Sequence, residues 1–588
     1  MNSHTLSKIK QTLEAPRYSL PLFTFLSAYF FFLSPIAYIS RPLGLMISLL
    51  VFLNLKTIKF DYKTKPELLI FFFIWMYLTF AFFGYDLFIV RQEQSKLLCL
   101  FYFALGSVWT IYVFQATLAF FNRKRPNNKA TAQNSYLPKW ILLTVIIIAV
   151  LFIYEIAYNP GMISPDSYGS LRRNADGTIT NWHPPLYTFF VLFFFNISSK
   201  VETVTIAQIF IFAIAFSTCF IYLHKLGCKF RTLLISAFIV PLIPSVGLHS
   251  VTVWKDGPFA ISMLWLTYSI IKTIDLFSHK EEKPEKRQTL SVGIQLSLSL
   301  TLVFFLRANG FLVTVLVGIS MLILFLYRKN WKMCGSLVAT IVLVLLIQFP
   351  VYSIMKVVDS PFKDKAKYIA GIHDLQATYY AGGQLSEDAL ITLKRTIPKI
   401  DEIKDEFRPD WALHANYDMS ELTTNEFVHA YIETLAHNPK PMIKSVLNRT
   451  RAYWVIAPKA GIGCVNYTSI LNDEDGSTNT NTAPSIGVNR NINRITHIAG
   501  SFLKFMNLEI PATIIWRFGI WIALLFICSF HIFLKKRYLY LLTFVPVFIY
   551  VFTIYIASGW HDYRYGLSVF FIGMFLVAAT CLKDFSKE

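Results

Sequence analysis

Repeated apolar runs of about twenty residues are the feature that most constrains this chain. Its 588 residues are 55% hydrophobic and only 15% charged, and the runs recur along most of its length. Runs of this length match a helix that crosses a bilayer, and a soluble core does not need them throughout a sequence. We therefore expect an all-α polytopic membrane protein with about 14 transmembrane helices. The expected spans are 18–39, 42–57, 67–84, 97–121, 139–157, 202–223, 230–247, 257–276, 289–306, 311–328, 332–352, 512–533, 537–556 and 563–582.

The net charge of +20 comes largely from short basic tracts between the apolar runs. These tracts lie at 122–129, 279–287, 327–332 and 535–537. Basic residues in short connecting loops are typical of the cytoplasmic side of membrane proteins, so we expect the lipid bilayer, and no nucleic acid, as the partner of this charge. The seven cysteines are scattered, most of them in apolar runs, and indicate neither a disulfide framework nor a zinc cluster.

One apolar stretch, 186–197 ("LYTFFVLFFFNI"), decides the orientation of everything after it. It is short for a span and follows two prolines, which suits an interfacial or re-entrant helix. If it does not cross, the basic tracts, including 224–231, all fall on the side of the basic N-terminus. If it crosses, every tract after residue 200 moves outside, against the orientation bias. We therefore expect a multi-pass plasma-membrane protein with both termini in the cytoplasm.

This topology predicts that the polar stretches of the chain gather outside the cell. They are the first outer loop 158–201, the stretches 249–258, 307–310 and 558–566, and the long segment 353–511. The expected organisation is N-terminal transmembrane helices at 1–138, a transmembrane catalytic core at 139–352, a mainly helical extracytoplasmic domain at 353–511 and C-terminal transmembrane helices at 512–588.

Within 353–511, helix signals mark three elements. Ser386 and Thr424 each precede an acidic first turn and are expected as N-caps. A proline-started helix is expected in the stretch "HNPKPMIKSVLNRTRAYWVI", which runs to Trp454 and beyond. The polar stretch 472–493 is expected to be a loop.

The first outer loop holds the strongest candidate residues. Asp166, in "SPDS", suits an Asx turn or a helix cap, or else a carboxylate that accepts a proton or binds a cation. Arg172 and Arg173 suit lipid headgroups, or a phosphate gripped by bidentate contacts. His183, in "NWHPPL", could cap the helix that follows or donate to a phosphate or a substrate hydroxyl.

Two further outer stretches carry paired charges. In "VWKDGPF", Lys255 precedes Asp256, which suits an N-cap of the next span or a second carboxylate of a site shared with Asp166. Arg307, at the break in "LRANGF", either snorkels to the interface or meets an anionic group.

The stretch before the last expected span adds a third group of charges. "ASGWHDYRYG" offers His561, Asp562 and Arg564. Arg564 stands at the entrance to an apolar helix, so a purely solvated role suits it poorly.

At these residues the chain resembles the GT-C superfamily of membrane glycosyltransferases, which take sugars from polyprenyl-phosphate carriers. It looks most similar to bacterial members related to protein O-mannosyltransferases and aminoarabinose transferases. The likeness rests on "SPDS" in the first outer loop, "WHPPLY" before a short juxtamembrane helix, the following "VWKD", and "RYG" before the last span. It covers roughly 139–330 and, more weakly, the C-terminal motif.

The resemblance implies a GT-C-like fold and an inverting transfer of a sugar from undecaprenyl phosphate or a similar carrier. Asp166 would be the general base and Asp256 the second acidic catalytic residue. The candidates for the donor phosphate are Arg172, Arg173, His183, Lys255, Arg307, His561 and Arg564. No cofactor is assigned, although Asp166 and Asp256 are candidate ligands for a divalent cation such as Mg²⁺ or Mn²⁺.

The chain also departs from the family pattern. Many relatives carry an acidic pair in the first loop, whereas "SPDSYG" has one carboxylate, and four or five spans precede this loop where the family normally has one. The sugar and the envelope acceptor, whether teichoic acid, another cell-wall polysaccharide, lipid or protein, stay open. So do three alternatives: a polysaccharide polymerase or ligase with a lipid-linked donor, a transporter or flippase of envelope precursors, and a non-catalytic assembly factor for envelope polymers.

Overall fold

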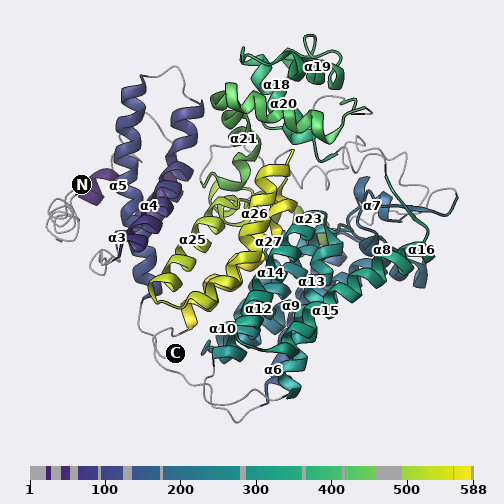
Figure 1. Ribbon diagram of the computed structural model, residues 1–588. Helices are drawn as coiled ribbons and strands as arrows, with labels where there is room; N and C mark the ends of the chain where they lie inside the picture. The colour runs from purple at the N-terminus through teal and green to yellow at the C-terminus, as the bar shows by residue number, and fades with distance from the viewer. Residues whose placement is uncertain are drawn as a thin grey trace.

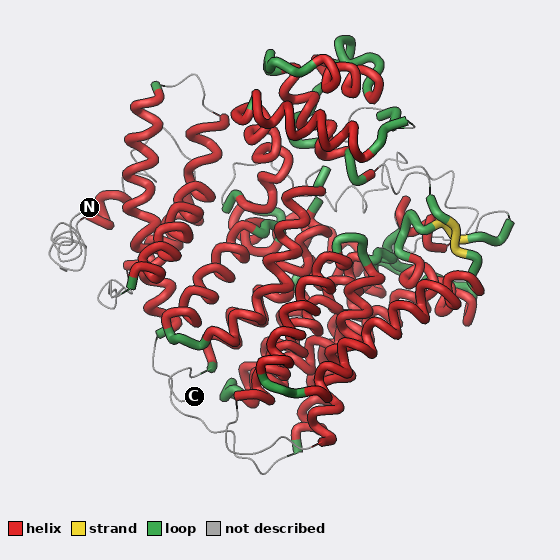
Figure 2. The backbone as a smooth tube through the Cα atoms, in the orientation of Figure 1, coloured by secondary structure: helices red, strands yellow, loops and turns green. Residues whose placement is uncertain are grey.

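The structure is a computed structural model, and almost all of its regular elements are helices (Figures 1 and 2). It describes residues 22–27, 41–52, 64–90, 95–122, 135–163, 165–171, 176–278, 286–360, 366–412, 417–419, 421–456, 493–559 and 562–583. Within these ranges, ten helices are long and apolar enough to cross a membrane. A helix satisfies its own backbone hydrogen bonds, which is the condition for crossing a bilayer. The chain is therefore an all-α, multi-pass membrane protein.

The ten membrane-length helices coincide with ten of the expected spans. They are Lys65–Gly84 (α4, Lys65–Thr79, and a π-helical end), Lys96–Phe121 (α5), Tyr136–Ala157 (α6), Glu202–Lys225 (α9), Asp256–Phe277 (most of α12, Asp256–Ser278), Lys286–Leu306 (α13), Gly310–Tyr327 (α14), Trp331–Ile354 (α15, Trp331–Leu346, and its continuation through α16, Tyr352–Ile354), Tyr538–Ala557 (ending in α26, Val545–Ala557) and Tyr563–Leu582 (η12, Tyr563–Gly566, and α27, Leu567–Leu582).

The remaining four expected spans differ from single straight helices. The run 230–247 forms two helices, α10 (Phe230–Leu242) and α11 (Pro244–Val251), bent by 62° at Pro244. Only α3 (Arg41–Phe52) of the run 42–57 is described, and most of 18–39 lies outside the described residues. The total of about 14 spans thus stays a prediction.

The expected span 512–533 is broken into α24 (Glu509–Ile515) and α25 (Gly519–Leu534). Two backbones approach closely beside this break: a Cβ at Gly519 would lie 2.7 Å from the carbonyl oxygen of Val455. Glycine here lets the end of α21 (Pro439–Trp454) abut the start of α25.

The stretch after the two prolines forms α8 (Pro185–Ser198), a helix of 14 residues that is shorter than the ten membrane-length helices. This agrees with the expected short helix at 186–197. A two-residue parallel pairing joins β1 (Ile179–Thr180), just before α8, to β2 (Val357–Val358), just after α16 (Figure 2).

The described part of 353–511 is a helical unit with its own small core, above the long helices in Figure 1. It contains α18 (Ile369–Tyr380), α19 (Glu387–Thr396), α20 (Thr424–His437) and α21, and α23 (Arg494–Met506) follows. Ser386 caps α19 as expected, and α21 starts at a proline as expected. The cap of α20 is Thr423, one residue before the expected Thr424, because its side chain bonds the backbone of Glu426 in a capping box. The expected loop 472–493 lies, except for Asn493, outside the described residues.

A fully buried ion pair joins this helical unit to the end of α26. Arg449 donates through Nε and Nη2 to the two carboxylate oxygens of Asp374, at 3.0 and 3.1 Å. Its Nη1 donates to the carbonyl oxygens of Ser558, at 2.8 Å, and of Tyr555, at 3.2 Å. Arg449 is 2% exposed and Asp374 is not exposed at all. One guanidinium therefore fixes the end of α26, directly before "HDYRYG", to α18 and α21.

Asp374→Asn removes one charge of this pair and leaves the other buried. We expect a cost of about 3–5 kcal/mol, since an uncompensated buried charge is strongly destabilising. Hydrogen exchange of α18 and α21 in detergent should rise by two orders of magnitude or more. Arg395→Gln is the matched control, because its pair with Glu426 is 36% and 42% exposed and should change stability by about 1 kcal/mol or less. Equal exchange in both variants would contradict the anchoring role.

Candidate functional site

Seven polar side chains from five separate segments meet at the end of the helices where α12 begins. We call this group the ionic cluster. Its members are Asp166, His183, Lys255, Asp256, Arg307, Asp562 and Arg564. They come from α7 (Pro165–Leu171), the turn before α8, the start of α12, the link between α13 and α14, and the start of η12. The stretches that the sequence singled out thus lie together.

Asp166 is the carboxylate of the ionic cluster that is most open to solvent, with 34% of its side chain exposed. Its Oδ2 accepts a hydrogen bond of 2.6 Å from Nη1 of Arg564 and lies 3.9 Å from Nζ of Lys255. Asp166 lies in the first turn of α7, so it is neither an isolated Asx turn nor the residue before a helix. Burial alone raises the pKa of Asp166, but Arg564 and Lys255 outweigh burial and the net shift is downward. The carboxylate is therefore anionic at neutral pH.

Hydrogen bonds hold α7 and the residues before it against the backbone of the segment before α12. Ser167 donates from Oγ to the carbonyl oxygen of Val253 at 2.8 Å. Met162 exchanges backbone hydrogen bonds with Val251 and Val253, at 2.8 and 3.0 Å. The buried amide of Gln208 in α9 donates to the carbonyl oxygen of Thr252 at 2.9 Å. These bonds set the distance between Asp166 and Lys255.

His183 is a buried, neutral acceptor in the ionic cluster. Lys255 donates from Nζ to Nδ1 of His183 at 3.2 Å, and the ring is only 8% exposed. Burial, and next the charge of Lys255, lower the pKa of His183 to about 4. Gly169 gives the ring its space, because a Cβ there would lie 2.7 Å from the ring. The helix after His183 begins with Pro184 as its cap, so His183 does not cap it.

Arg564 bridges two carboxylates. Its Nη1 donates to Asp166, and its Nε lies 2.6 Å from Oδ2 of Asp562. The guanidinium lies over the ring of Trp254, 5.0 Å from its centroid, and is 11% exposed. The backbone N–H of Asp562 donates to the hydroxyl of Tyr453 at 3.3 Å, so the end of α21 helps to place this segment.

Asp256 and Arg307 form a second, deeper pair. Nη1 of Arg307 donates to Oδ1 of Asp256, whose side chain is 1% exposed. Arg307 also lies over the ring of Tyr565, 4.4 Å from its centroid. Asp256 is the first residue of α12 rather than the residue before it, which corrects the N-cap alternative. Its catalytic role stays a prediction, and its burial against Arg307 favours a role in positioning that cation.

The ionic cluster carries three carboxylates and three cations, and His183 adds no charge at neutral pH. In a site whose charges already balance, an anion can bind only if it replaces a carboxylate as the partner of one of the cations. Asp166 is the carboxylate placed to do so, because it is the most exposed and Lys255 stands 3.9 Å from it. The site therefore combines a displaceable base with cations that can receive a phosphate.

Six of the nine predicted site residues meet in the ionic cluster: Asp166, His183, Lys255, Asp256, Arg307 and Arg564. Arg172, Arg173 and His561 lie outside the described residues, so their roles stay predictions. Tyr453 was not anticipated, because its helix carries no motif and its contact with Asp562 joins positions far apart in the chain. Within the described residues, no group of three or more His, Cys, Asp or Glu side chains is close enough to hold a metal ion, and the roles of Asp166 and Asp256 as candidate ligands for a divalent cation stay untested.

Comparisons with known protein families, with curated proteins and with solved structures find no match to this chain. By its fold and its ionic cluster, the protein is a polytopic membrane protein with a largely buried ionic site at one end of its helices. The resemblance to the GT-C superfamily stays a hypothesis that rests on the sequence motifs.

The neutral state of His183 gives the protein a specific pH dependence. Its pKa in the fold, about 4, lies below its usual 6.5, so the unfolded chain takes up a proton at a higher pH than the folded protein does. The contribution of the neutral His183 ring to the free energy of unfolding is therefore fully present above pH 6.5. That contribution should fall away as the pH drops from 6.5 towards 4, by about 3 kcal/mol in total. His183→Gln should therefore lose less thermal stability than the wild type between pH 7 and pH 4.5, measured as Tm in detergent.

His429→Gln is the control for this experiment, because its side chain is 70% exposed. It should keep the wild-type pH dependence. If His183→Gln also kept the wild-type dependence, His183 would not be held neutral by the fold.

Proposed function

We propose that this protein is a glycosyltransferase that moves a sugar from a polyprenyl-phosphate carrier to an acceptor in the cell envelope. The observation that carries the proposal is the position of Asp166, a partly exposed carboxylate between two cations of the ionic cluster. Sugar transfer from a lipid phosphate needs a base for the acceptor hydroxyl and cations for the departing phosphate. The ionic cluster offers both, next to the apolar helices where a lipid carrier would lie.

The distribution of basic residues supports an extracytoplasmic site. Lys225, Lys272, Arg328 and Lys535 lie at the ends of α9, α12, α14 and α25 that are opposite to the ionic cluster. Basic residues in such positions favour the cytoplasm. On this basis the ionic cluster faces outward and both termini face the cytoplasm, in a plasma membrane.

In the proposed reaction, the acceptor hydroxyl attacks the anomeric carbon of the donor sugar. Asp166 takes the hydroxyl proton as the new carbon–oxygen bond forms. The bond between the anomeric carbon and the phosphate oxygen breaks, and its electron pair leaves with the polyprenyl phosphate. Attack opposite to the leaving group inverts the configuration of the sugar.

The low pKa of Asp166 in the free protein is consistent with this role. Arg564 and Lys255 lower that pKa against the effect of burial, so Asp166 alone is a weak base. A donor phosphate that binds Arg564 and Lys255 offsets their positive charge, so these cations lower the pKa of Asp166 less. The carboxylate then becomes more basic when the donor is in place, and the leaving phosphate keeps the two cations that stabilise its charge.

The other members of the ionic cluster would support this exchange. His183 accepts a hydrogen bond from Lys255 and so directs the ammonium group towards Asp166. The pair of Asp256 with Arg307 places a buried cation beside Tyr565, within the same cluster. Arg172, Arg173 and His561 remain candidates for the donor phosphate from the sequence.

A polysaccharide polymerase or ligase would use the same chemistry with a larger lipid-linked donor. It differs in its product, which would grow by oligosaccharide units instead of single sugars. A transporter or flippase of envelope precursors would move its substrate without forming a glycosidic bond, so it would keep its function when Asp166 loses its charge but keeps its shape.

Asp166→Asn should abolish transfer, with a fall of at least about 100-fold, because the amide cannot take up the proton. The measurement compares the envelope glycans, by mass spectrometry, of cells that carry no protein, the wild type or the variant. Asp166→Glu should retain partial activity, since it keeps the carboxylate. Asp176→Asn is the matched control, because this aspartate lies in the same outer loop and its carboxylate bonds Thr178, outside the ionic cluster.

Equal amounts of folded protein in the membrane, checked by size-exclusion chromatography, are required for all variants. Near wild-type transfer by Asp166→Asn would contradict the catalytic assignment.

A further inference from the structure

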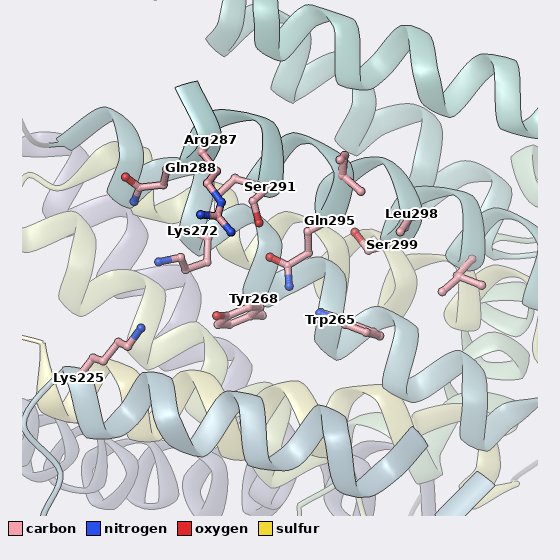
Figure 3. A pocket seen from close by; sticks show the side chains of 13 residues that line it. Lys225, Trp265, Tyr268, Lys272, Arg287, Gln288, Ser291, Gln295, Leu298 and Ser299 are labelled. Atoms are coloured by element: carbon pink, nitrogen blue, oxygen red, sulfur yellow. The ribbon is translucent and has the colours of Figure 1, made fainter. Parts of the chain in front are cut away.

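A cavity with both charged and apolar walls lies at the end of the helices opposite to the ionic cluster. It measures about 880 Å³ and opens between α9, α12 and α13 (Figure 3). Along α12, Lys272 in this cavity follows Asp256 in the ionic cluster by 16 residues, which corresponds to about 24 Å of helix. The cavity is therefore not part of the proposed reaction site.

One end of the cavity is rich in positive charge. Lys225, Lys272 and Arg287 line this end, and Figure 3 shows them on the same side of the space. Lys225 also lies over the ring of Tyr136, 4.8 Å from its centroid. Among the described residues, no acidic side chain forms an ion pair with any of these three cations. Three cations gathered at the mouth of one cavity indicate a site for an anion.

Asp275, the acidic residue nearest in the chain to Lys272, is hydrogen-bonded to other side chains. Asp275 accepts hydrogen bonds from Nζ of Lys583 at 2.8 Å and from the hydroxyls of Tyr222 and Tyr540 at 2.9 and 3.0 Å. These three donors already occupy the carboxylate of Asp275, which lies two turns from Tyr268 on the same face of α12. Asp275 is therefore not the counter-ion of this site.

The opposite end of the cavity is apolar, with polar groups between the two ends. Leu298 and Leu302 of α13 line the apolar end. Gln295 and Trp265 point into the space from facing helices (Figure 3). The indole Nε1 of Trp265 is buried and has no hydrogen-bond partner among the described residues, which leaves a donor available to a ligand.

We propose that this cavity binds an anionic glycerophospholipid from the leaflet on its side of the membrane. The lipid phosphate lies among Lys225, Lys272 and Arg287. A glycerol ester carbonyl, the next acceptor below the phosphate, receives the indole N–H of Trp265, and an acyl chain follows Leu298 and Leu302. The order of cationic, polar and apolar groups along the cavity matches the order of groups in such a lipid. This site does not depend on whether the ionic cluster transfers a sugar.

The test is native mass spectrometry of the full-length protein in detergent, titrated with dioleoyl phosphatidylglycerol or with dioleoyl phosphatidylcholine. The wild type should bind one phosphatidylglycerol with at least about tenfold preference over phosphatidylcholine. The triple variant Lys225→Gln, Lys272→Gln, Arg287→Gln should bind phosphatidylglycerol about 100-fold more weakly, from about 1 kcal/mol for each basic residue. Trp265→Phe should weaken both lipids by a few fold, because both have the ester carbonyl.

The matched control removes the same charge from other exposed positions at the same end of the helices. It is the triple variant Arg231→Gln, Lys329→Gln, Lys535→Gln, and it should bind phosphatidylglycerol as the wild type does. Equal weakening by both triple variants would show a diffuse charge effect and overturn the site. Displacement of phosphatidylglycerol by millimolar inorganic phosphate would show a free-phosphate site and overturn the lipid assignment.

Discussion

The contact of Asp166 with Arg564 and Lys255 is the interaction on which the rest of the functional site depends. It joins α7, the start of α12 and the start of the last long helix, three segments far apart in the chain. The charges cancel within a partly buried site, where an unpaired carboxylate would be costly. An anion that competes for Arg564 and Lys255 therefore changes the basicity of Asp166 directly, and the proposed reaction uses this coupling.

The surrounding fold can be understood as the support for that contact. Ser167 and Met162 bind the loop to the segment before α12, and Gly169 leaves room for His183. On the other side, the buried pair of Asp374 and Arg449 fixes the end of α26, from which the chain leads to Arg564. The helical unit within 353–511 thus has two structural roles. It covers this end of the long helices, and it sets the position of Arg564 in the ionic cluster.

The sequence predicted the helical membrane fold well, because apolar length alone decides whether a helix can cross a bilayer. It also identified six residues of the ionic cluster, since a charged residue beside an apolar run is energetically unfavourable unless it is paired, solvated or part of a functional site. It did not predict the close approach of two backbones at Gly519, which joins segments far apart in the chain. Nor did it predict the pair of Asp374 with Arg449, whose members lie within ordinary amphipathic helices. The shift of a helix cap from Thr424 to Thr423 reflects two adjacent threonines with equal local chemistry.

The central claim is that the ionic cluster works on the outer face of the membrane, and labelling of single cysteines tests it most directly. In a background without the seven native cysteines, Asp176→Cys reports on the loop of Asp166, and Lys329→Cys reports on the opposite end of the helices. A membrane-impermeant maleimide should label position 176 in intact cells and position 329 only after permeabilisation. Labelling of position 329, and not of 176, in intact cells would contradict the account.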